Sequence, residues 1–392
     1  MLGRSSLPSN FFNACYSGLS LNDYTMSWRH PVCVMLAFFM IHSGIARGQD
    51  KELDDQAKPE KQSLEEIKNA AIVNDYRTLN NYSFADGVAS LVESKQSWRE
   101  DRKCISCHTT GWGLAAQPII DSGSDEVAEG RAFAQEYLSG YLEGEIKPHK
   151  QYGSIEGQVA TAAFLAMSDA RSGDEVHEIT RQGLDHAWEL LDASGTWEEW
   201  LQCNWPPFES DAEFGPTLML VALGELREIA ALEEQDLKAA TKLRKYLQDN
   251  PPLSLHAKAM RLWAAMYWSE LMPAKERSAW LQELLDAQAT DGGWSMASLA
   301  GPAWKRDGGE GQTTTSEAYP TAFVTYVLLQ TGLESKDAVI LEGRHWLRQH
   351  QREGGDWFTR SPRRDRKHYI SRAATAFSLL ALTESEMESA LE

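Results

Sequence analysis

Cysteine and positive charge are both scarce in this sequence of 392 residues. Five cysteines are too few to hold a disulfide-rich scaffold together. Lysine and arginine total 38 against 57 acidic residues, which leaves a net charge of −19. A surface this acidic repels phosphate backbones, so we expect no nucleic-acid partner. The hydrophobic content of 42% is enough for a large folded core, which excludes a disordered or fibrous protein.

Long hydrophobic runs are also missing. Residues 31–41 (PVCVMLAFFMI) form an apolar run that is too short to cross a bilayer. Arg29 precedes this run, and Ala46 and Gly48 take positions −3 and −1 of a cleavage site, which is the order of a secretory signal. We therefore expect a signal peptide at 1–48, with Met26 as a possible true start, and export to the periplasm or beyond. An uncleaved anchor is the alternative; after cleavage, no membrane span is expected.

Strand-like alternation bounded by hairpin turns is absent, and helical periodicity takes its place. Residues 49–66 are polar and without periodicity, so we expect a flexible linker there. Residues 67–392 then form a single all-α domain. Apolar residues recur at helical spacing in 127–142, 157–167, 176–191, 215–231, 256–272, 278–288, 319–333, 337–350 and 371–382.

Four segments share the plan of a turn that ends in tryptophan. The clearest are residues 288–294 (QATDGGW) and 351–357 (QREGGDW), and the weaker ones are 192–197 (DASGTW) and 95–98 (KQSW). Glycine stands where a helix would stop, and the three later turns each lead to a helix rich in small residues. This pattern resembles the repeat of squalene–hopene cyclases and protein prenyltransferases over roughly residues 70–390. The resemblance implies an α/α toroid built from helical hairpins.

The catalytic signatures of those families are missing. The Asp-x-Asp-Asp motif of the cyclases has no counterpart, because residues 52–55 (ELDD) lie in the linker and residues 209–212 (ESDA) lack paired carboxylates. The prenyltransferase zinc site is not matched either, since Cys203 has no Asp or His beside it in the expected pattern. We therefore do not expect a class II terpene cyclase, and enzymatic activity stays open.

The most specific motif is a C-x-x-C-H run at residues 104–108 (CISCH). Two thiols at this spacing can add to the vinyl groups of haem, while the adjacent histidine meets the iron from the same side. We therefore predict one covalent haem c, with thioethers at Cys104 and Cys107 and with His108 as the proximal iron ligand. A disulfide or redox pair and a zinc site are the alternatives.

The place of this motif in the repeat predicts where haem would lie. It follows Trp98 closely, so we expect it in the loop after the first turn, at the end of the toroid where loops enter the inner helices and the family's cavity opens. Our first choice for the distal iron ligand is His149. The alternatives are Met167, His256, Met296 and an open five-coordinate iron, although His256 is also well placed for a capping or hydrogen-bonding role.

Further polar and aromatic residues in the loops are candidates for lining a binding cavity. They are Trp304, Glu317, Tyr319, His368 and Arg372. Three hypotheses of function follow. The first is an exported haem c protein that works in electron transfer or redox sensing with a partner protein. The second is an enzyme that binds an isoprenoid or another small apolar ligand in the toroid. The third is a non-catalytic interaction module with a metal or disulfide at Cys104 and Cys107.

Overall fold

The computed structural model describes residues 82–105, 107–146, 154–173, 175–197, 200, 212–363 and 370–391. The expected signal peptide and linker lie outside these residues. The described part contains no extended strand, and an isolated bridge pairs Ser295 with Ser316. No helix in this part of the chain combines the length and apolarity that a membrane crossing requires.

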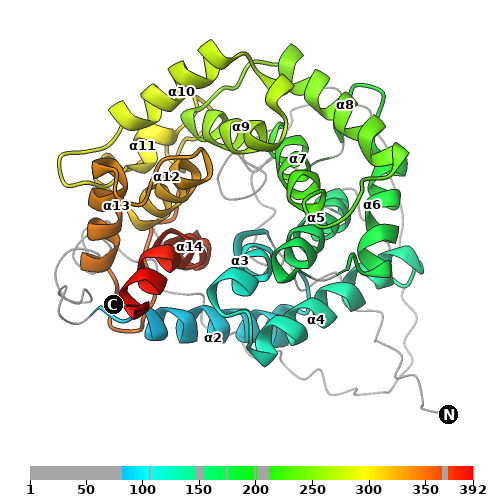
Figure 1. The fold of residues 1–392 in the computed structure, drawn as a ribbon, viewed down its shortest axis with the longest axis horizontal. Coiled ribbons are helices and arrows are strands. Elements are labelled where there is room, and N and C mark those ends of the chain that lie inside the picture. The colour runs from blue at the N-terminus through cyan, green and yellow to red at the C-terminus, as the bar shows by residue number, and fades with distance from the viewer. Residues whose placement is uncertain are drawn as a thin grey trace, which may run out of the picture.

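The helices form two concentric rings, with each outer helix followed by an inner helix (Figure 1). The outer ring consists of α2 (Phe84–Arg102), α4 (Asp125–Leu142), α6 (Glu178–Leu190), α8 (Glu234–Asp249), α10 (Ala274–Asp286) and α13 (Ala338–Gln349). The inner ring consists of α3 (Trp112–Ile120), α5 (Ser154–Ser172), α7 (Phe214–Leu226), α9 (Leu255–Tyr267), α12 (Ala318–Gln330) and α14 (Ile370–Leu391). Short segments η4 (Cys107–Gly111), η5 (Ser269–Leu271) and α11 (Met296–Leu299) lie between them.

The inner ring closes on itself. Each inner helix packs against the next along the chain, and α14 packs against α3 to complete the circle. The first outer helix, α2, packs against the last inner helix, α14. This arrangement is an α/α toroid, as the resemblance implied.

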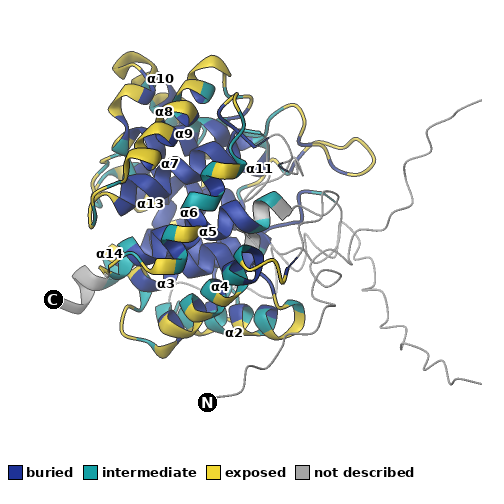
Figure 2. Cartoon of the chain, turned by 90° about the vertical axis from the view of Figure 1, so that its right-hand side faces the viewer, coloured by how far each residue is buried: buried dark blue, intermediate teal, exposed yellow. Residues whose placement is uncertain are grey.

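The two rings differ in sequence because they differ in surroundings. Every residue of α7 is buried, and so is the stretch of α12 from its start to Leu328. The outer helix α8 buries only one face, which includes Leu243 and Leu247, and exposes lysines and Glu234 on the other (Figure 2). A helix that is apolar all round is stable only in the interior, whereas an amphipathic helix suits the rim.

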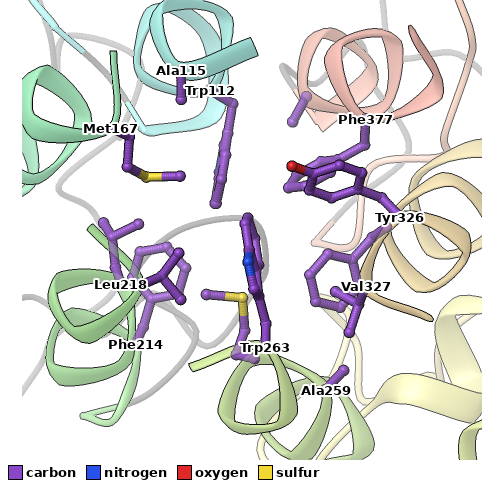
Figure 3. Packing of buried hydrophobic residues seen from close by; sticks show 14 of the residues in the cluster. Trp112, Ala115, Met167, Phe214, Leu218, Ala259, Trp263, Tyr326, Val327 and Phe377 are labelled. Carbon is purple, nitrogen blue, oxygen red and sulfur yellow. The ribbon is translucent and has the colours of Figure 1, made fainter. Parts of the chain in front are cut away.

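Aromatic side chains fill the axis of the inner ring (Figure 3). The Trp112 ring lies 6.1 Å from that of Trp263 and 4.6 Å from that of Phe377. Phe164 meets Trp112 edge-on at 5.2 Å. Because rings from facing helices meet at the centre, this part of the toroid is a packed core and not an open channel.

The turns after α6, α10 and α13 share one construction. Each tryptophan indole N–H donates to the carbonyl ten residues earlier: Trp197 to Ala187, Trp294 to Leu284 and Trp357 to Leu347. Each turn also holds a left-handed glycine, with φ of 89° at Gly195, 86° at Gly292 and 84° at Gly355. A Cβ at any of these glycines would collide with a backbone carbonyl of the next outer helix. Glycine is therefore required both for the turn and for the close approach of the helices.

The sequence predictions hold for these three turns and fail for the fourth. Residues 95–98 lie within α2 and form no turn, so this prediction was wrong. The buried residues there, Lys95 and Trp98, are two of the inward positions of a continuous helix. The nine predicted helical ranges all coincide with helices, while α2, α3 and α8 were not predicted.

Candidate functional site

The C-x-x-C-H segment joins outer helix α2 to inner helix α3. Helix α2 is capped by Lys103 in the left-handed conformation (φ 54°, ψ 37°), and the Lys103 N–H donates to the Arg99 carbonyl at 3.1 Å. This cap turns the chain inward, so Cys104 and Ile105 are buried. The chain then forms the helical turn η4, which leads directly into α3. The motif thus lies at the N-terminal end of an inner helix, as expected, although it follows a helix end and not a glycine turn.

Cys104 is disulfide-bonded and only 2% exposed. A sulfur in a disulfide is not a thiol, so the same atom cannot at that time carry a thioether. The described residues contain no group of three or more His, Cys, Asp or Glu side chains placed to hold a metal ion. The bonded sulfur of Cys104 is what the disulfide alternative expects.

Two arginines lie against Trp98, the tryptophan that precedes the motif. Trp98 is buried just before the motif, with the Arg102 guanidinium 5.7 Å and the Arg372 guanidinium 5.5 Å from its ring centre. Arg372 also donates to the Ser94 carbonyl at 3.2 Å, which ties the start of α14 to α2. Next to the cysteines, Thr109 is buried and its hydroxyl has no partner. By residue type, two cysteines and a following histidine are the donor set that a c-type haem takes, and this requires Cys104 as a free thiol.

The structure brings two of the expected cavity residues, Trp304 and Tyr319, against His256, and Glu317 is the N-cap of the helix that carries Tyr319. Trp304, Glu317 and Tyr319 are all buried near the N-terminal ends of α9 and α12. The His256 Nε2 atom lies 2.9 Å from the Tyr319 hydroxyl, and the Trp304 ring lies 5.4 Å from the imidazole. Arg372 lies elsewhere, against α2.

The structure does not identify a distal iron ligand among the histidines and methionines that the sequence suggested. His368 and His149 lie outside the described residues. Met167 and Met296 are buried in the core, and Met167 reaches the axis close to Trp112 (Figure 3). His256 has the hydrogen-bonding role that its sequence position allowed.

Burial controls the ionisation of this cluster. It lowers the pKa of His256 to about 3 and raises the pKa of Glu317 to about 7. The Arg360 backbone N–H donates to Glu317 at 2.9 Å, and the charges of Arg360 and Arg306 also favour the carboxylate, but desolvation outweighs them. At neutral pH the imidazole is therefore uncharged, and the carboxyl group is close to its midpoint.

A hollow of about 1330 Å³ lies at the opposite end of the toroid, where the inner helices terminate. We call it the C-terminal hollow. Its lining includes Ile119, Arg171, Glu225, Tyr267, Leu329 and Leu380. None of Trp304, Glu317, Tyr319 or Arg372 belongs to this lining, and the motif at Cys104 enters the inner ring at the other end.

Arg171 and Glu225 form a buried ion pair in this hollow. The Arg171 Nε and Nη2 atoms each donate to a Glu225 oxygen at 2.7 Å, and Nη1 donates to the Ala115 carbonyl at 2.9 Å. Nη2 also donates to the Tyr326 hydroxyl at 3.2 Å. Burial raises the pKa of Tyr326 to about 12, so this phenol keeps its proton at neutral pH.

Sequence reasoning missed these residues, although each left a signal. Arg171 ends the Ala-rich helix α5, and Glu225 is the one charged residue of the otherwise apolar helix α7. A charge at the end of a buried helix must find a partner, because an unpaired buried charge is costly. The identity of the partner depends on how the inner helices are arranged, since 54 residues separate Arg171 from Glu225 in the sequence.

The comparison with known proteins found similar solved structures. No family model and no curated protein matches this chain. The chain is similar to a polysaccharide lyase at 12% identity and a TM-score of 0.48, over 78% of this chain and 98% of that one. It is also similar to ent-copalyl diphosphate synthase from Streptomyces platensis at 15% identity and a TM-score of 0.43, over 70% of this chain and 49% of that one. The assignment as an α/α toroid rests on the closed helix rings themselves.

Proposed function

We propose that this protein is an exported redox protein that carries one haem c, attached through Cys104 and Cys107 and ligated by His108. The observation that carries the proposal is the C-x-x-C-H run at the start of an inner helix, where η4 continues into α3. When bound there, haem supplies one-electron transfer. The N-terminal apolar run supports export, because c-type attachment takes place outside the cytoplasm.

The chain's own residues define what attachment requires. Each thiol adds its sulfur and its proton across a vinyl group, so Cys104 has first to be released from its disulfide by a thiol reductant. Arg102 and Arg372, whose guanidinium groups lie over the Trp98 ring, would supply positive charge for the carboxylates of a bound haem. The acidic surface of the whole chain favours a redox partner with a basic docking face.

A second candidate function follows from the bond at Cys104. A non-catalytic module would use this disulfide as a structural cross-link, and the Cys104 sulfur would stay buried as it is in the structure. In that case the cysteines stabilise the toroid and carry no cofactor. The two candidates differ in a measurable property, because one sulfur cannot serve in both bonds.

The test is a visible spectrum of the full chain produced in a host with c-type cytochrome maturation, together with its intact mass after denaturation. The proposal expects Soret and α bands and the added mass of one haem. His108→Ala removes the proximal ligand, so any haem that still attaches becomes high-spin. The matched control is His345→Ala, an exposed histidine of the outer helix α13, which leaves the spectrum unchanged. A colourless wild-type protein that has lost two hydrogens to a disulfide would instead establish the second candidate.

A further inference from the structure

The C-terminal hollow has the size and position of a ligand site. Its volume of about 1330 Å³ exceeds that of a pocket for an ordinary small molecule. Much of its wall is apolar and includes Ile119, Leu333 and Leu341. Ile119 (38% exposed) and Leu341 (52%) both line this hollow, so its wall offers apolar surface to a ligand.

The hollow contains a buried hydrogen-bond donor that no described residue uses. Tyr326 is only 4% exposed, and its hydroxyl accepts from Arg171. The arginine side chain has no acceptor atom, so the Tyr326 hydroxyl proton takes no part in that hydrogen bond. Figure 3 shows the phenol with its oxygen turned toward the ring axis, where Trp263 and Phe377 hold the aromatic ring at 5.3 and 6.0 Å. A fixed, buried hydroxyl with a free proton suits an acceptor on a ligand.

The charges in the hollow are already paired. Arg171 pairs with Glu225, Arg344 with Glu384 at 3.1 Å, and Arg348 with Glu386 at 3.0 Å. Lys336 pairs with Glu334 at 2.5 Å. A charged ligand would have to break such a pair, and for the buried Arg171–Glu225 pair this leaves an unpaired buried charge. An uncharged ligand keeps all of these pairs.

We propose that the C-terminal hollow binds a neutral ligand that carries hydroxyl groups on an apolar ring skeleton. A hydroxyl group both accepts and donates hydrogen bonds. A ligand hydroxyl can therefore accept a hydrogen bond from the Tyr326 hydroxyl and donate one to a remaining lone pair of Glu225. The ring skeleton packs on Tyr267, Leu329 and the other apolar lining residues. This chemistry has two sources, a neutral sugar chain and a hydroxylated polycyclic lipid, and both are accommodated by an open hollow of this size.

Titration of tryptophan fluorescence in the full chain tests the proposal, because the Trp263 ring packs against the Tyr326 ring. The probes are cellohexaose, the glucuronate hexamer of equal length, and a monohydroxylated pentacyclic triterpenoid in detergent micelles. We expect one of the two neutral probes to bind and thereby to identify the source. The glucuronate oligomer should bind at least tenfold more weakly than the neutral sugar if the sugar is that source, and it should fail to compete if the lipid is.

Two variants locate the binding. Tyr326→Phe removes the hydroxyl and keeps the ring, so it weakens binding by about tenfold, as the loss of one hydrogen bond predicts. Leu341→Trp narrows the hollow and abolishes binding. The matched control is Leu237→Trp, a similarly exposed leucine (48%) of outer helix α8, which leaves binding unchanged.

Three outcomes overturn the proposal. One is that neither neutral probe binds. Another is that the charged oligomer binds as tightly as the neutral probes. The last is that binding survives both Tyr326→Phe and Leu341→Trp, which would place it outside the hollow. Circular dichroism of each variant confirms that a lost signal does not come from a lost fold.

Discussion

At the scale of single residues, burial decides how Glu317 and His256 behave. Both are almost completely inaccessible, and both have pKa values displaced toward the uncharged form. His256 is held between the Tyr319 hydroxyl and the Phe323 ring, whose centre lies 4.5 Å away. Both polar residues are therefore held uncharged or nearly so among buried neighbours at the ends of inner helices.

Glu317 makes stability depend on pH. The unfolded carboxyl releases its proton from about pH 4.5, whereas the folded one holds it until about pH 7. Between these values the folded state binds more protons, so the free energy of unfolding falls as pH rises, by about 3 kcal/mol in all. Glu317→Gln keeps the acceptor for the Arg360 N–H and stays uncharged, so this loss disappears. Denaturant midpoints at pH 5 and pH 8 check this, and an equal loss in both proteins would contradict it.

At the scale of elements, the repeated turns define how the helices follow one another. A helix ends, a left-handed glycine reverses the chain, and the indole of the next tryptophan returns to bond the helix that has just ended. The threonines Thr321 and Thr375 then accept from the Trp294 and Trp357 backbone N–H groups at 2.9 and 3.1 Å. Each turn is therefore fastened to the inner helix that follows it.

Two adjacent glycines allow a matched test of this turn. Gly355 has φ of 84° and packs against the Asp86 carbonyl, so Gly355→Ala adds both strain and a collision. We expect the free energy of unfolding to fall by about 2 kcal/mol. For Gly354→Ala the closest atom is a side-chain oxygen of Asp356 at 3.4 Å, so the effect is small. Thermal unfolding followed at 222 nm compares the two, and equal melting temperatures would refute the assignment.

At the scale of the whole molecule, Gln351 closes the outer ring. Its amide nitrogen donates to the Gly355 carbonyl at 2.9 Å and to the Ser83 carbonyl at 2.8 Å, and its oxygen accepts from the Ser83 N–H at 2.8 Å. Ser83 is the N-cap of α2, so the turn after the last outer helix is bonded to the start of the first. Gln288 makes the corresponding bonds within the ring, to Gly292 and Val339.

Removing this closure should loosen the seam of the ring. Gln351→Ala leaves the Ser83 N–H without its partner, whereas the Ser83 carbonyl still accepts from the Gly87 N–H, and we expect a loss of about 2 kcal/mol in the free energy of unfolding. Hydrogen exchange should rise first at the start of α2 and in the facing part of α14. Gln282→Ala, which removes an exposed bond to Asp286 on α10, serves as the control. Unchanged exchange at α2 in the Gln351 variant would show that packing alone closes the ring.

Local patterns were sufficient to predict most of the helices. Helical periodicity located nine ranges, and the glycine–tryptophan turns located the hairpins. Helix α3 was missed because it is short, contains Pro118 and is apolar on nearly every side, so it shows no periodicity. The turn expected at residues 95–98 failed because a tryptophan alone does not end a helix when no glycine accompanies it. The motif at Cys104 was evident from spacing, and its haem stays a prediction.

The sequence by itself determined the helical class, the position of the turns and the contrast between apolar inner and amphipathic outer helices. These properties depend on residues within one or two helical turns of one another. Only the tertiary structure decided which charges pair, since Arg171 meets Glu225 across 54 residues and Tyr326 across 155. It also decided that Gln351 reaches Ser83 across 268 residues, and that the hollow lies opposite the cysteine motif. Such contacts exist only once the ring has closed, because closure, and not chain neighbourhood, brings these side chains together.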